Sequence, residues 1–68
     1  MEKILSTLKE HRKLVNLTQK QVASLCCISE RQYIRYETGE QEPGVYTALK
    51  IAEALNTTVE ELFPIEGE

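Results

Sequence analysis

The sequence predicts an all-α domain built from five short helices. Three observations support this class. The chain of 68 residues is long enough for one domain, helix caps and helix breakers recur at short intervals, and no stretch sustains the alternation of a strand. We therefore expect a single domain over residues 1–68. Folding of so short a chain buries only about 60% of its unfolded surface, so a partner subunit would help to stabilise it.

The first helix is expected over about residues 3–15. Asn16 then ends it, because asparagine tolerates the left-handed conformation that follows many helices. The apolar face of this helix comprises Ile4, Leu8 and either His11 or Val15.

The second and third helices are expected at 18–26 and 29–37. Thr18 and Ser29 are good N-caps, and Gly39 ends the later helix. Each cap is followed three residues later by a glutamine that can complete a capping box, namely Gln21 and Gln32.

The short connection between these two helices is the informative spacing. Two helices joined by two or three residues fit a helix-turn-helix at about 18–37, in which the second helix lies in the major groove of DNA. By spacing alone, an ordinary αα-hairpin fits equally well.

The fourth and fifth helices follow a break at Pro43-Gly44. The pair is separated by Asn56-Thr57-Thr58, and Pro64 ends the last helix. The apolar positions are Val45, Leu49, Ile51, Ala52 and Leu55 in the fourth helix, and Val59, Leu62 and Phe63 in the fifth.

The net charge of −3 hides a polarised distribution. Residues 1–37 hold seven basic and four acidic groups, whereas residues 38–68 hold one basic and seven acidic groups. Because steering depends on the local field, the first half of the chain can still meet an anionic partner.

Several classes of protein are excluded by what the sequence lacks. No apolar run approaches the roughly 20 residues of a membrane span, and the first residues lack a signal peptide's apolar stretch, so we expect a cytoplasmic protein. The adjacent Cys26 and Cys27, with His11 as the only histidine, predict neither a disulfide framework nor a metal site. No catalytic triad, Cys-His pair or phosphate loop is visible, so we expect neither an enzyme nor a cofactor.

A series of motifs along the chain is similar to that of a known family. The motifs, in order, are Leu17-Thr18-Gln19, Val22-Ala23, Ile28-Ser29, Tyr36-Glu37-Thr38-Gly39, Pro43, Leu49 to Asn56, and Val59-Glu60-Glu61-Leu62-Phe63. This series resembles the Cro/CI-type (Xre-type) helix-turn-helix family from about Leu8 to Phe63. The resemblance implies a five-helix, phage-repressor-like DNA-binding domain of a bacterial or phage regulator, usually dimeric.

The resemblance also implies roles for individual residues. Arg12 and Glu37 match a structural ion pair between the first and third helices, and Ala23 matches the small residue at the crossing of the two motif helices. Base reading falls to Glu30, Arg31, Gln32 and Arg35, phosphate contacts to Gln19, Thr38 and Gln41, and the dimer interface to Val59, Leu62, Phe63 and Ile65.

Two of these roles have alternatives. Glu30 can accept a hydrogen bond from cytosine or can simply favour the positive end of the helix dipole. A Gln32 side chain turned inward to complete a capping box cannot also read a base.

The chain also departs from the family pattern. Cys27 replaces the usual turn glycine and therefore predicts a strained or reshaped turn. Glu40-Gln41-Glu42 replaces a basic loop, which predicts weak non-specific affinity for DNA. Tyr33 and Tyr36 replace aliphatic residues and are expected to pack in the core, with their hydroxyls at its rim.

The predicted function is that of a homodimeric repressor that binds duplex DNA at an inverted-repeat operator. The alternative is a protein-binding module, an antirepressor or antitoxin-like partner that uses the same fold. Dependence of DNA binding on Arg31 and Arg35 distinguishes the two hypotheses.

Overall fold

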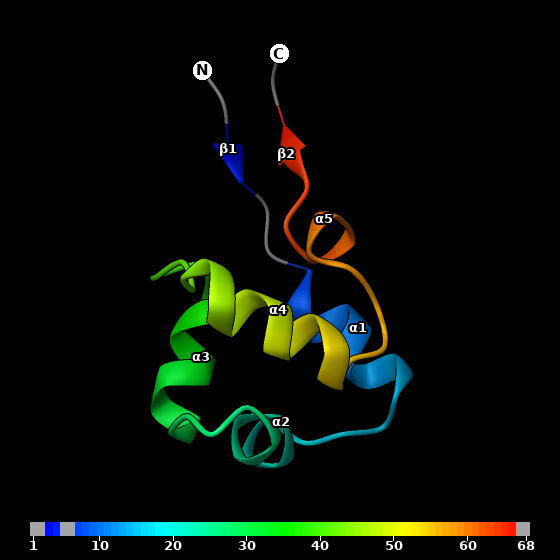
Figure 1. The fold of residues 1–68 in the computed structure, drawn as a ribbon, viewed down its shortest axis with the longest axis vertical. Helices are drawn as coiled ribbons and strands as arrows, with labels where there is room; N and C mark the ends of the chain where they lie inside the picture. Colours follow the sequence, from blue (N-terminus) through cyan, green and yellow to red (C-terminus); the bar gives the residue numbers. More distant parts are fainter. Residues whose placement is uncertain (1–2, 5–6, 67–68) are drawn as a thin grey trace.

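The computed structural model describes residues 3–4 and 7–66 and contains the predicted five helices. The elements are β1 (Lys3–Ile4), α1 (Leu8–Leu14), α2 (Gln19–Leu25), α3 (Glu30–Thr38), α4 (Val45–Ala54), α5 (Val59–Leu62) and β2 (Ile65–Glu66). The helices pack together, and the two short strands, β1 and β2, lie side by side on one side of the bundle (Figure 1).

The start of α1 differs from the prediction. Residues 3–4 form an antiparallel pair with 65–66 instead of the first turn of a helix. Thr7 then anchors the chain to α5, because its backbone N–H donates to Leu62 O over 3.1 Å. The helix therefore begins only at Leu8, and Ile4, which shares its helical spacing, is not part of α1.

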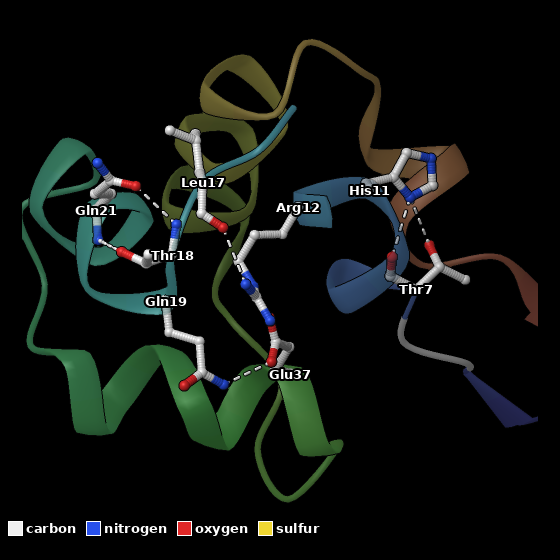
Figure 2. Close-up of polar contacts among 8 residues, drawn as sticks. All are labelled: Thr7, His11, Arg12, Leu17, Thr18, Gln19, Gln21 and Glu37. Carbon is white, nitrogen blue, oxygen red and sulfur yellow. Dashed lines mark hydrogen bonds and ion pairs between the residues drawn. The ribbon is translucent and has the colours of Figure 1, made fainter. Parts of the chain in front are cut away.

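Thr7 and His11 fix the two ends of the chain to each other. Thr7 Oγ1 lies 3.0 Å from the carbonyl oxygens of both Glu61 and Leu62. His11 Nδ1 lies 3.0 Å from Thr7 O and 3.1 Å from Thr7 Oγ1 (Figure 2). His11 is thus a half-buried structural residue in the middle of α1.

The predicted starts of α2 and α3 are confirmed. Thr18 and Gln21 form the full capping box: Gln21 N–H donates to Thr18 Oγ1 over 3.1 Å, and Thr18 N–H donates to Gln21 Oε1 over 2.8 Å. Ser29 Oγ accepts from Gln32 N–H over 3.0 Å, but the Gln32 side chain does not return to complete a second box.

Three helices end in the same backbone motif. Asn16, Cys27 and Asn56 follow α1, α2 and α4 with φ of 59°, 60° and 59°. In the turn after α2, Cys27 N–H donates to Ser24 O over 3.2 Å and Ile28 N–H to Ala23 O over 3.0 Å, as in a Schellman motif. The backbone of Cys27 thus adopts the left-handed conformation, which brings its Cβ close to the following carbonyl oxygen, so the turn is strained as expected.

Every helix contributes buried side chains to the core. Tyr33 and Tyr36 belong to it, at 0% and 6% exposed, as expected. Leu62 is also fully buried, so it stabilises the subunit itself and cannot contact a partner as we expected. The other fully buried large side chains are Leu8, Val22 and Ile51, and Cys26 is buried where Cys27 is exposed.

Candidate nucleic-acid interface

The helices α2 and α3 pack against each other. Ala23 of α2 is 2% exposed and belongs to the core. The turn between the helices runs only from Cys26 to Ser29. This packing leaves the outer face of α3 uncovered.

A polar network joins α1, the start of α2 and the end of α3. Arg12 Nε donates to Glu37 Oε2 over 2.6 Å, and Gln19 Nε2 donates to the other carboxylate oxygen, Oε1, over 2.7 Å (Figure 2). Arg12 Nη1 also donates to Leu17 O over 3.0 Å. The Arg12–Glu37 ion pair is thus present between the predicted helices.

Both charges of this pair are largely withdrawn from water. The side chains of Arg12 and Glu37 are 13% and 5% exposed. Burial opposes ionisation of Glu37, but the hydrogen bonds from Arg12 and Gln19 outweigh it, so the pKa of Glu37 is lowered. The hydrogen bond to Glu37 in turn raises the pKa of Arg12. The pair therefore stays charged at neutral pH and fixes α3 against α1.

Tyr33 brings a hydroxyl to this network without completing it. Burial, followed by the nearby Glu37 charge, raises the pKa of Tyr33 far above its ordinary value. The oxygen is buried close to Arg12 and Glu37, but no hydrogen bond of ordinary length joins it to a partner among the residues that the structure describes. The hydroxyl thus lies inside the core and not at its rim, which corrects our expectation.

The outer face of α3 carries the charged side chains predicted to read bases. Glu30, Arg31 and Arg35 are all exposed. They surround a shallow hollow on this face together with Ile34 and Glu40. Within the described part of the chain, neither arginine guanidinium forms a hydrogen bond or ion pair, so their donors are free for a ligand.

Gln32 is placed differently from its predicted neighbours. Its Nε2 donates to Tyr36 Oη over 2.9 Å and to Gln41 Oε1 over 3.1 Å. Both amide hydrogens of Gln32 are therefore used to join α3 to the loop that follows it. The sequence could not reveal this arrangement, because a flexible amide has many acceptors within reach.

The residues predicted to contact phosphates lie at both ends of the motif. Gln19 is at the start of α2, and one of its two amide hydrogens is used by Glu37. Thr38 is exposed at the end of α3, where its Oγ1 donates to Arg35 O over 3.2 Å. Gln41 is exposed in the loop that follows.

An apolar groove lies on α4 and α5, apart from the residues that α3 exposes. It has a volume of about 290 Å³ and includes two of the predicted interface residues, Val59 and Phe63. Val45 and Leu49, which were not among the predicted interface residues, line the same groove and are 79% and 54% exposed. Their helical spacing of four residues was the available signal. Ile65 contributes backbone to β2, and its side chain lies outside the described residues.

No helix among the described residues is long and apolar enough to cross a membrane. Over the same residues, no three His, Cys, Asp or Glu side chains converge in the manner of a metal site.

Comparison with known proteins gives concordant matches. The transcriptional repressor RstR of the cryptic phage CTXphi, from Vibrio cholerae serotype O1, is 42% identical over 60 residues, which are 88% of this chain but 54% of RstR. The chain thus spans about half the length of that relative. An uncharacterised HTH-type transcriptional regulator from Methanocaldococcus jannaschii is 34% identical over 61 residues, 90% of this chain and 92% of the relative. Residues 8–62 match the helix-turn-helix family profile. The chain therefore belongs to the Cro/CI-type (Xre-type) helix-turn-helix family of DNA-binding transcriptional regulators.

Proposed function

We propose that this protein is a sequence-specific repressor that reads the DNA major groove with α3. One observation carries the proposal: Arg31 and Arg35 lie on the exposed face of α3 with free guanidinium groups. The major groove, about 12 Å wide, admits one helix, and arginine forms a bidentate pair with guanine O6 and N7.

The buried network gives α3 the rigidity that base reading requires. Because Glu37 holds Arg12 and Gln19 at once, the end of α3 cannot move without separating a buried ion pair. The same network orients Gln19, whose second amide hydrogen is available to a phosphate oxygen at the start of α2. Gln41 would contact a phosphate on the other side of the groove, and Thr38 would do so once its hydroxyl hydrogen turns from Arg35 O to the phosphate.

The acidic groups near α3 set limits on affinity. Glu40 and Glu42 follow α3 and are exposed, so they repel phosphates at the edge of the interface. We expect weak non-specific binding and a specific complex that depends on the arginine contacts. Release of counterions from the remaining phosphate contacts would weaken the complex as salt increases.

A second copy of the chain is the proposed occupant of the α4–α5 groove. Val59 and Phe63, which were predicted for the interface, line this groove together with Val45 and Leu49, and Leu62 is left out because it is buried. Two-fold pairing would place two α3 helices against half-sites about one helical turn, or 34 Å, apart. Occupation of such an operator in the cytoplasm would block a promoter that overlaps it.

Selection of genomic DNA fragments by the purified protein tests this function. The wild type is expected to enrich an inverted repeat that Arg31→Ala does not enrich. Lys13→Ala is the matched control, because it removes one exposed positive charge from α1 and should leave the selected sequence unchanged. Failure of the folded wild type to enrich any sequence would contradict the proposal.

The apolar groove also favours a second candidate, a module that binds another protein. Exposed Val45 and Leu49 would serve such a partner as well as a second copy. Under this alternative, Arg31→Ala and Arg35→Ala would leave binding to the partner protein intact. Leu49→Glu would abolish it.

A further inference from the structure

Ile34 is an apolar side chain among the charged side chains on the exposed face of α3. It is half-buried in the hollow that Glu30, Arg31, Arg35 and Glu40 surround. Helical geometry places it one turn from Glu30 and from Arg31, so these three side chains project from the same side of α3.

The fold itself does not account for this residue. The partly buried hydrophobic side chains that pack against the core, among the residues described, do not include Ile34. A β-branched residue is also a slightly poorer helix former than a straight-chain one. An isoleucine in this position therefore adds little to the stability of the subunit.

Gln32, also predicted to read a base, has no free amide hydrogen for that purpose. Gln32 uses both amide hydrogens on Tyr36 and Gln41, which leaves it without a donor for adenine. The free groups around the hollow are then the carboxylates of Glu30 and Glu40, the two arginine guanidiniums and the isoleucine side chain.

We propose that Ile34 is a specificity-determining residue that selects thymine through its 5-methyl group. Thymine is the base that presents a methyl group in the major groove, and an apolar side chain recognises it by excluding water. Because Ile34 lies between Glu30 and Arg31 around the helix, it selects a thymine next to the base pair that Arg31 contacts. This inference rests on the proposed function of α3 in DNA reading.

Replacement of thymine by uracil removes that methyl group alone and so provides a direct test. The probe is the operator duplex recovered by fragment selection, with each thymine replaced in turn by uracil, and the readout is the Kd from fluorescence anisotropy at one salt concentration. At one thymine in each half-site, uracil is expected to weaken wild-type binding about fourfold, the loss for one buried methyl-sized group. Ile34→Ala should bind the thymine duplex more weakly and should not discriminate thymine from uracil at that position.

Two variants complete the design. Gln32→Ala is expected to keep the uracil effect, since its amide does not contact the methyl group. Ile34→Val, which keeps a branched apolar side chain, should retain part of the effect and guards against a defect of folding in Ile34→Ala. The inference is overturned if uracil is tolerated at every position, or if the uracil effect persists in Ile34→Ala. Failure of the proposed function is a different result, in which the wild type selects no duplex.

Discussion

Replacement of Glu37 by glutamine tests the role of the buried network. The carboxylate is 5% exposed and accepts hydrogen bonds from Arg12 and Gln19, so Glu37→Gln leaves the 13%-exposed guanidinium without its counterion. Removal of one partner of a buried ion pair costs about 3–5 kcal/mol. A domain of this length has a free energy of unfolding of about 3–10 kcal/mol. We therefore expect a loss of about 3 kcal/mol and a fall in Tm of roughly 10–25 °C, measured by circular dichroism at pH 7.

The pH dependence of the stability of Glu37→Gln shows whether the loss comes from the missing negative charge or from altered packing of the side chain. Because the pKa of Glu37 is lowered in the folded state, its contribution is complete above the unfolded value of about 4.3 and is lost as the pH falls through the folded pKa. The difference in stability between wild type and Glu37→Gln should therefore be constant from pH 6 to 8 and should shrink below about pH 4. A difference below about 0.5 kcal/mol at pH 7, as for an exposed ion pair, would refute the reasoning.

Four further variants test other features of the structure. Cys27→Gly is expected to raise the free energy of unfolding in urea by about 1 kcal/mol, because φ of 60° costs glycine no steric strain; a decrease would show that the turn is not strained. Tyr33→Phe removes a buried hydroxyl that lacks a partner and should change stability by less than about 0.5 kcal/mol, whereas Tyr36→Phe removes the acceptor of Gln32 and should cost about 1 kcal/mol. Equal losses for the two tyrosine variants in urea would contradict this difference. Leu49→Glu should leave Tm unchanged at low protein concentration but halve the mass measured by analytical ultracentrifugation, and a wild type that sediments as a monomer would disprove the α4–α5 interface.

Local signals in the sequence predicted most of the helices. Thr18 and Ser29 cap α2 and α3 as expected, and Asn16 adopts the left-handed conformation that ends α1. Such signals are reliable because each depends on hydrogen bonds between residues three to five apart. The Arg12–Glu37 pair joins distant parts of the chain, and only the family resemblance predicted it.

Features set by tertiary packing were predicted less well. The helical spacing of Ile4 and Leu8 favoured a helix from residue 3, but pairing of the two chain ends prevails there. The family resemblance assigned Leu62 to an interface, and α5, with only four residues, is too short for the sequence to show which apolar side chain faces the core. The side-chain contacts of Gln32 depend on the position of the loop that carries Gln41.

The most direct test of the central claim is the Kd of Arg31→Ala and Arg35→Ala on the selected operator and on variants with single base-pair changes. Each variant is expected to lose about 1–3 kcal/mol of discrimination at one base pair in each half-site and to keep its preference at the others. Equal weakening on every duplex would mean that the arginines contact only phosphates, which would contradict base reading by α3.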